Sequence, residues 1–223
     1  MCCGDEFAAK MLLLNLASSV YGRKDGMPLG SFNINLFTTE QGPASFMAEQ
    51  IKNFAEGIST NTLAHKVTIK SMSQIPLTPK KNYDQNKLIP GLFQMPLHTT
   101  VVLDETEMVP GKLEGEIAIT NLRAITELIE SQSIHYNFQY HEQEFQTSCP
   151  VTVVSCGRSL FKNSISVPVN PQSSDLEVCK SLTDLQLRHI ACMIHRTKKE
   201  QIEFLQEVQA YASDRFVEMR EEE

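Results

Sequence analysis

The segment Thr-Thr-Val-Val-Leu-Asp-Glu-Thr-Glu-Met, residues 99–108, contains the strongest fold signal in the chain. Its apolar run, Val101 to Leu103, ends abruptly in two adjacent carboxylates, Asp104 and Glu105. β-Branched residues followed by a sharp polar stop predict a buried strand that emerges at the carboxyl edge of a sheet. Open α/β sheets bind their ligands at that edge, so the two carboxylates mark a place to look for function.

Two interpretations of this strand end are open. In nucleotide hydrolases of the P-loop class, such a strand is the Walker B element, in which the Asp holds Mg²⁺ through water and the Glu polarises the attacking water. The simpler interpretation is a buried strand that ends in a solvated turn. An apolar strand followed by Asp-Glu is a common pattern, so the stretch alone favours the simpler one. A phosphate-binding loop elsewhere in the chain would decide between them.

A phosphate-binding loop needs small residues, because its backbone N–H groups must curl around phosphate oxygens. The candidate is Gly4–Met11, in which Lys10 follows the glycine by six residues at the start of a predicted helix. Met11 occupies the Ser/Thr position and has no hydroxyl for Mg²⁺, and Phe7 places a bulky ring where the loop must be tight. The strand that should lead into the loop is truncated or missing. We therefore expect no nucleotide turnover.

Composition narrows the class of protein. The chain has 223 residues, a net charge of −7 and an ordinary apolar content, which suits one soluble α/β domain with or without a small helical appendage. The negative charge argues against broad non-specific binding to phosphate backbones but leaves room for a local basic patch. No signal peptide and no membrane span are predicted. Six cysteines without a Cys-x-x-Cys pair predict no zinc ribbon, and no metal site or cofactor is expected.

Alternation and helical spacing predict the order of the elements. Helices are expected over about 5–21, 42–57, 83–89 and 120–131, strands over 31–37, 65–71, 101–105, 133–140, 144–148, 150–156 and 165–169, and a loop over 22–30. A linker is expected at 171–175, followed by helices over 183–195 and 198–219. The predicted organisation is an α/β domain over 1–170 and a helical lid or hairpin with an acidic tail over 171–223.

Several motifs in collinear order resemble one known family. They are Gly91-Leu92-Phe93-Gln94-Met95-Pro96, Val101-Val102-Leu103-Asp104-Glu105-Thr106, Tyr136-Asn137-Phe138-Gln139-Tyr140-His141 and Gly157-Arg158-Ser159-Leu160, with further matches over 14–21, 28–32 and 216–220. Together they make the chain similar to the C-terminal part of the mini-chromosome maintenance (MCM) complex-binding proteins. The similarity covers nearly the whole chain but only the C-terminal portion of the family's usual length.

The resemblance implies a design like that of the MCM helicase subunits, which are AAA+ ATPases, with degenerate nucleotide sites. On that template Gly4–Met11 stands at Walker A, Val101–Glu105 at Walker B, Ile134–Cys149 at the β-hairpin before sensor 1 and Val151–Cys156 at the sensor-1 strand. Two departures matter. The chain has Ser155-Cys156 where a sensor-1 Asn is expected, and the helicases' Ser-Arg-Phe-Asp segment is not found after Arg158.

The fold class implied is α/β, a degenerate AAA+/P-loop-like and mostly parallel sheet with flanking helices, a β-hairpin insert and a C-terminal helical lid. The function implied is a non-catalytic protein of the nucleus, with the cytoplasm as a second location, that binds MCM helicase subunits and regulates MCM assembly or unloading in DNA replication. No direct sequence-specific nucleic-acid binding is expected, and the sequence assigns no partner-contacting residue.

Three residues are predicted to be vestigial positions of a nucleotide site: Lys10, Asp104 and Glu105. Their present role would be structural, with the two carboxylates capping nearby backbone N–H groups or pairing with Lys10 or Arg158. The alternative is a residual ATP-binding or ATP-hydrolysing AAA+ module that uses the same three residues.

Overall fold

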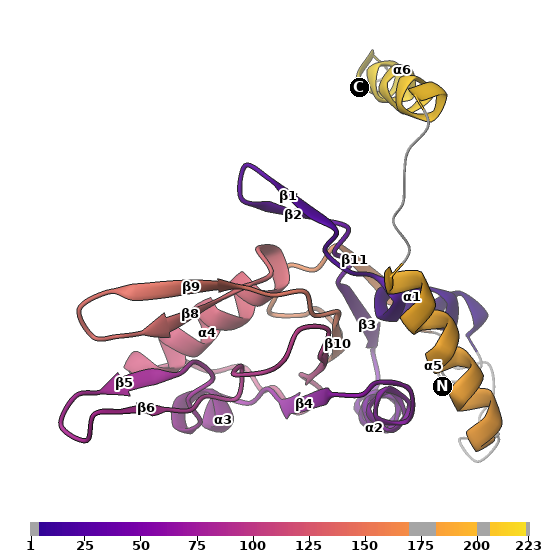
Figure 1. Cartoon of the computed structure of the whole chain (residues 1–223). Coiled ribbons are helices and arrows are strands. Elements are labelled where there is room, and N and C mark those ends of the chain that lie inside the picture. Colours follow the sequence, from indigo (N-terminus) through magenta and orange to yellow (C-terminus); the bar gives the residue numbers. More distant parts are fainter. Residues whose placement is uncertain (1–4, 170–181, 200–205, 222–223) are drawn as a thin grey trace.

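A computed structural model of the chain describes residues 5–169, 182–199 and 206–221 (Figure 1). Its centre is a five-stranded sheet of β3 (Ile34–Thr38), β4 (Thr62–Lys66), β7 (Thr100–Asp104), β10 (Val151–Cys156) and β11 (Ile165–Pro168). The strand order is β11-β3-β10-β7-β4, and every pairing in it is parallel. The predicted mostly parallel α/β sheet is therefore confirmed, and β11 is the edge strand that its short alternating sequence indicates.

Strands β7 and β10 lie inside the sheet because their side chains are apolar on both faces. Val151 is opposite Val101, and Val153 is opposite Leu103. Alternate residues of β7 enter two separate cores, with Val102 in one and Val101 and Leu103 in the other. A strand buried on both faces reads as a continuous apolar run, which is why this element is visible in the sequence.

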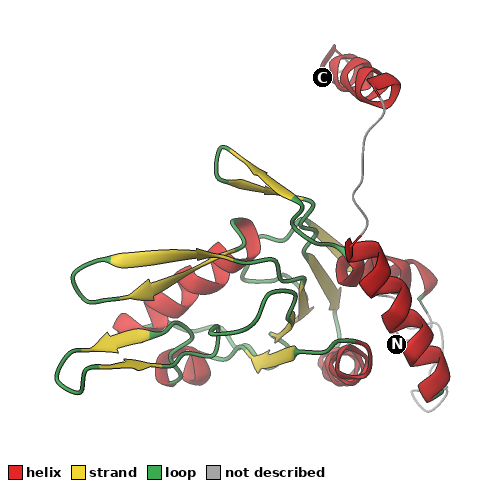
Figure 2. Cartoon of the chain, in the orientation of Figure 1, coloured by secondary structure: helices red, strands yellow, loops and turns green. Residues whose placement is uncertain are grey.

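Helices cover both faces of the sheet (Figure 2). The first core lies under α1 (Glu6–Ala17), α2 (Gln41–Ile58) and α5 (Asp184–Lys199). The second lies under α3 (Ile69–Gln74) and α4 (Glu116–Glu130). Both α2 and α4 bury residues at three- and four-residue steps, as amphipathic helices do. The predicted helices over 5–21, 42–57 and 120–131 correspond to α1, α2 and α4, with small shifts at their ends.

A second sheet, of four strands, is built from two hairpins that lie side by side. The strand order is β6-β5-β8-β9, formed by β5 (Lys80–Asn82), β6 (Lys87–Ile89), β8 (Ser133–Asn137) and β9 (Glu142–Gln146). The predicted hairpin over 133–148 is confirmed by the antiparallel pairing of β8 with β9. A further two-stranded hairpin, β1 (Gly22–Lys24) with β2 (Met27–Leu29), stands where a loop was expected.

Two local predictions are wrong. The expected helix over 83–89 is a turn followed by β6, because Asn86 adopts a φ of 48° and its N–H donates to the carbonyl of Tyr83. The expected strand over 65–71 ends at Lys66 in β4, because Thr68 and Ser71 form a capping box that starts α3. In both places a local side-chain or turn geometry overrides the alternation of apolar residues.

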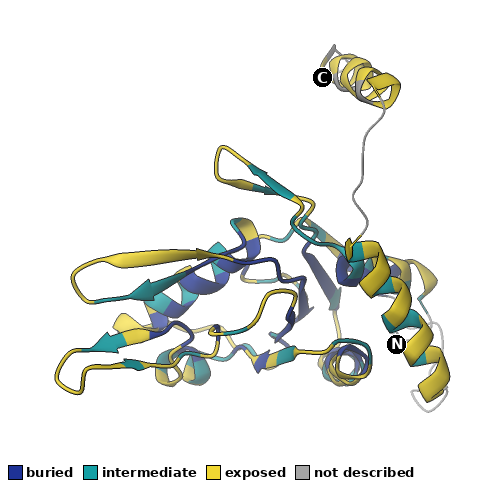
Figure 3. Cartoon of the chain, in the orientation of Figure 1, coloured by how far each residue is buried: buried dark blue, intermediate teal, exposed yellow. Residues whose placement is uncertain are grey.

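The C-terminal part contains two helices, α5 and α6 (Gln206–Glu221), as predicted. Leu187, Ile190 and Ile194 of α5 pack against the first core. The described side chains of α6 are exposed (Figure 3). The predicted linker at 171–175 lies outside the described residues, and the division of the chain at 170 stays a prediction. Among the described residues, no helix is long and apolar enough to cross a membrane.

Candidate functional site

The carboxyl ends of the parallel strands meet at one edge of the central sheet, and this edge holds the candidate site. Parallel strands all point their carboxyl ends the same way, so residues far apart in the sequence come together there. Asp104 ends β7 beside Lys66 of β4 on one side and Val154 of β10 on the other. Glu105 follows directly, and its N–H donates to the carbonyl of Val154 at 2.8 Å.

Asp104 shapes the turn that ends β7. Its Oδ1 accepts a hydrogen bond from the backbone N–H of Thr106 at 2.9 Å and another from the Thr106 hydroxyl at 2.7 Å. A carboxylate that accepts from the backbone two residues later is an Asx-turn, which replaces the strand pairing lost where the chain leaves the sheet. The predicted capping of backbone N–H groups is confirmed for this residue.

A short chain of hydroxyls links the same turn to helix α2. Ser45, in the first turns of α2, donates its hydroxyl to Thr106 Oγ1 at 3.2 Å. Thr106 is buried, and its hydroxyl in turn donates a hydrogen bond to Asp104. The start of the helix that follows β3 is therefore tied to the end of β7, although 61 residues separate Ser45 from Thr106.

Glu105 is a buried carboxyl, only 4% exposed. Its Oε2 accepts from the backbone N–H of Leu160 at 3.2 Å, while Oε1 has no hydrogen-bond partner among the described residues. Burial raises the pKa of Glu105, the charge of Asp104 raises it further, and hydrogen bonds from Ser159 and Leu160 oppose the shift. Glu105 thus anchors the loop that follows β10, at the cost of one unsatisfied oxygen.

Two of the pockets at this edge are lined by Asp104 or Glu105. One, of about 480 Å³, has a polar wall of Glu105, Ser155 and Arg158 and an apolar wall that includes Met108 and Leu113. Ser155 donates its hydroxyl to the side chain of Asn35 at 2.9 Å and to the carbonyl of Gly157, so its hydroxyl hydrogen is engaged within the sheet. Arg158 is exposed, and no ion pair joins it to Glu105 in the described part of the chain.

The other pocket, of about 540 Å³, lies between α2 and β4. Its polar lining combines opposite charges, namely Glu49, Lys52, Lys66 and Asp104, with Ser45 and His65. Lys66 forms an ion pair with Glu107, which raises the pKa of the lysine. His65 is largely buried and burial lowers its pKa. Within the described ranges, no group of three or more His, Cys, Asp or Glu residues could hold a metal ion.

Lys10 lies elsewhere than a phosphate-binding lysine would. It belongs to α1, which precedes the first strand of the central sheet instead of following a strand of it. Its side chain is 65% exposed and pairs with Glu6 one turn away, at 2.7 Å. Gly4 lies outside the described residues. Among the described residues, no strand of the central sheet leads into α1, so this geometry gives no support to a Walker A placement at Gly4–Met11, which stays a prediction.

The segment Thr38-Thr-Glu-Gln-Gly-Pro-Ala-Ser45 joins the end of β3 to the first turns of α2, with Thr39 and Glu40 as the loop between them. The sequence analysis assigns no site to this segment. A signal was present, because an alternating strand followed directly by Gly42-Pro43 and an amphipathic helix is the local pattern of a βα unit. The segment is missed because it lacks the lysine by which a phosphate-binding motif is recognised.

The comparisons with known proteins agree with one another. A family model described as mini-chromosome maintenance replisome factor matches residues 1–223. The chain is 30% identical to the mini-chromosome maintenance complex-binding protein of Salmo salar, over 99% of this chain and 36% of that protein. It is 32% identical to the protein of the same name from Rattus norvegicus, over 76% of the chain and 26% of that protein. The Dictyostelium discoideum protein of that name is 30% identical over 74% of the chain, and the chain spans 23% of its length.

Proposed function

The chain belongs to the mini-chromosome maintenance replisome factor family, and from that membership we propose that it is a non-catalytic protein that binds MCM helicase subunits. In that role it regulates MCM assembly or unloading in DNA replication, acting in the nucleus with the cytoplasm as a second location. The observation that carries the proposal is the family match over residues 1–223. Because the chain spans about a third or less of the relatives' length, binding by this portion is itself part of the proposal.

We further propose that the α/β domain is a degenerate AAA+-like module. Numbered in chain order, the five parallel strands lie in the order 5-1-4-3-2, with β10 between β3 and β7. AAA+ ATPases share this order, with the phosphate loop after the first strand and Walker B at the end of the third. Here the third strand is β7, which ends in Asp104 and Glu105. Topology and carboxylate position together support the assignment.

The segment that joins β3 to α2 supports a non-catalytic role. Against the pattern Gly-x-x-x-x-Gly-Lys-Ser, the residues Thr38–Ser45 keep the final serine but replace both glycines and the lysine. Pro43 stands at the second glycine and has no N–H to donate to a phosphate oxygen. Ala44 stands at the lysine, is fully buried and brings no positive charge. The groups that would hold β- and γ-phosphates are therefore replaced by groups that cannot.

The remaining half of that site has acquired structural contacts. Asp104, at the Mg²⁺-binding position, accepts two hydrogen bonds from Thr106, and Ser45 donates to the same threonine. Glu105, at the position that would polarise water, holds the N–H of Leu160. AAA+ modules pack against one another through their faces, so a module that has lost nucleotide chemistry keeps a shape suited to contacting MCM subunits.

A retention experiment tests the proposal. The purified chain, immobilised through a tag, is incubated with nuclear extract and separately with purified MCM subunits, and bound protein is detected with subunit-specific antibodies. We expect retention of at least one MCM subunit in both settings. A chain that unfolds cooperatively on heating, and so is folded, but retains no MCM subunit in either setting would contradict the proposal.

A further inference from the structure

The tips of the two hairpins in the four-stranded sheet expose aromatic rings to solvent. Tyr140, at the end of the β8–β9 hairpin, is 80% exposed, and Tyr83, at the end of the β5–β6 hairpin, is 45% exposed. With Phe138 and His141 they form one cluster, here called the aromatic tip. Aromatic side chains are major contributors to protein interfaces, and a group of them on one surface marks an interaction site more strongly than scattered apolar residues do.

The aromatic tip is held together by specific contacts. The rings of Tyr83 and Tyr140 meet edge to face with centroids 5.4 Å apart, and the Tyr83 hydroxyl donates to the carbonyl of Phe138 at 3.0 Å. Phe138 stacks on His141 at 5.2 Å, and its N–H donates to the His141 carbonyl. The two hairpins, distant in sequence, are thus joined at their ends. Rings that are already ordered lose little conformational entropy when a partner binds them.

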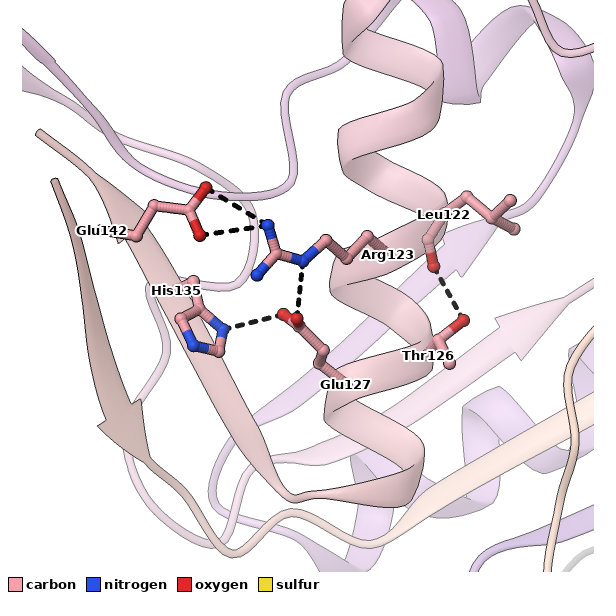
Figure 4. Close-up of polar contacts among 6 residues, drawn as sticks. All are labelled: Leu122, Arg123, Thr126, Glu127, His135 and Glu142. Atoms are coloured by element: carbon pink, nitrogen blue, oxygen red, sulfur yellow. Dashed lines mark hydrogen bonds and ion pairs between the residues drawn. The ribbon is translucent and has the colours of Figure 1, made fainter. Parts of the chain in front are cut away.

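A second set of contacts braces the β8–β9 hairpin against helix α4 (Figure 4). Arg123 of α4 pairs with Glu127 one turn along at 2.7 Å and with Glu142 of β9 at 3.0 Å. Glu127 also contacts Nδ1 of His135 on β8 at 2.8 Å. Single exposed ion pairs contribute little, but this network fixes the hairpin at two strands and compensates the charge of Glu142. The sheet that presents the aromatic tip is therefore fixed to the body of the domain.

The charge around the aromatic tip differs from that of the whole chain. Residues 80–89 contain three lysines, Lys80, Lys81 and Lys87, and one acid, Asp84, so this segment has a net charge of +2 in a chain of −7. The Lys81 ammonium lies 5.9 Å from the centre of the Tyr83 ring and donates to the side chain of Asn86 at 2.9 Å. The surface is aromatic at its centre and basic along the β5–β6 side.

We propose that the aromatic tip is the surface through which this chain contacts an MCM helicase subunit, by inserting Tyr83 and Tyr140 into an apolar pocket rimmed by carboxylates. This inference rests on the proposed function and specifies which surface of the chain makes the contact. A pre-ordered aromatic pair beside lysines fits such a pocket by shape and by charge. A protein is favoured over a nucleic acid because the exposed strand β9, which leads away from the tip, carries two glutamates, Glu142 and Glu144, and no lysine or arginine. Binding to a phosphate backbone would require a basic face there.

The test measures the affinity of the full chain for purified MCM subunits by biolayer interferometry. For the double variant Tyr83→Ala/Tyr140→Ala we expect a Kd at least tenfold higher, since buried interface aromatics commonly contribute that much or more. Tyr140→Phe keeps the ring and should bind within about twofold of the natural chain. The matched control is Tyr211→Ala on α6, where the tyrosine is 70% exposed and lies outside the tip; its Kd should not change. Thermal unfolding of each variant confirms that the domain remains folded.

The charge component is tested with Lys80→Glu/Lys87→Glu, which should weaken binding and reduce its dependence on salt. If the natural chain binds no MCM subunit, the proposed function fails. If it binds and the double tyrosine variant binds equally well, the function stands and the aromatic tip is overturned as its surface. Binding of a labelled single-stranded oligonucleotide that the tyrosine variant abolishes, with MCM binding unaffected, would overturn the assignment in favour of nucleic acid.

Discussion

Replacing Thr106 by valine tests whether the end of β7 has become a structural junction. The substitution keeps the shape of the side chain and removes its hydroxyl, which donates to Asp104 at 2.7 Å and accepts from Ser45 at 3.2 Å. The backbone N–H of residue 106 continues to cap Asp104. The change therefore isolates the hydroxyl chain between α2 and β7 from the turn itself.

The expected loss follows from these two hydrogen bonds. A hydrogen bond to a charged group contributes about 1.5–3 kcal/mol, and a long neutral one about 0.5 kcal/mol. The new buried methyl returns up to about 0.8 kcal/mol. The net destabilisation is about 2 kcal/mol, which for a chain of this size lowers the melting temperature by about 4–8 °C. Ser45→Ala removes only the neutral bond, and the hydroxyl it removes lines a pocket, so this variant should lose about 0.5 kcal/mol.

Urea denaturation of the natural chain, both single variants and the double variant measures these values directly. The double variant should lose less than the sum of the single losses, because both changes break the Ser45–Thr106 bond. Saturating Mg²⁺ and ATP should not alter any of the four stabilities. A Thr106→Val variant as stable as the natural chain would refute the structural role of the junction. A stability gain with Mg²⁺-ATP that Asp104→Asn abolishes would refute the loss of nucleotide binding.

Three further predictions concern Glu105, the hairpin brace and nucleotide. The folded-state pKa of Glu105 is raised above its ordinary value of 4.5, so its contribution to stability is fully present below about pH 4.5 and is lost as pH rises through the folded pKa. Glu105→Gln should therefore flatten the dependence of the unfolding free energy on pH, measured by urea denaturation from pH 4 to 8. An unchanged slope would contradict this prediction. Arg123→Met should weaken the brace on β8–β9 by about 0.5–1 kcal/mol and speed hydrogen exchange in that hairpin about threefold, while β10 exchanges as before. Isothermal titration with Mg²⁺-ATP should give no binding heat for the natural chain or for Lys10→Ala; saturable binding that Lys10→Ala removes would favour the residual ATPase.

The elements with long, regular patterns are predictable from the sequence. The apolar run ending in Asp104 and Glu105 predicts β7 and its place at a carboxyl edge, and the valine run of 151–154 predicts β10. Helices α2 and α4 follow from apolar residues at three- and four-residue steps. These predictions succeed because burial on one or two faces requires a regular pattern of apolar residues within the segment itself, which does not depend on the rest of the chain.

Short elements and the site were decided by contacts between distant residues. The turn after Asn82 and the capping box at Thr68 are local geometries that compete with apolar alternation, so the predictions for 83–89 and 65–71 are wrong. The spacing of Lys10 from Gly4 is that of a phosphate-binding motif, although only the tertiary structure shows that α1 precedes every strand of the central sheet. Spacing along one segment cannot report which strand that segment follows in space.

The chain's own sequence was sufficient to establish an α/β domain, its Asp-Glu strand end and its family resemblance, because each depends on residues close together or on ordered motifs. Tertiary structure alone decided that β10 lies between β3 and β7, that Ser45 reaches Thr106, and that Tyr83 meets Tyr140. Each of these requires two segments to be brought together by burial of a shared core. That burial is a property of the whole fold, so no single stretch of sequence records it.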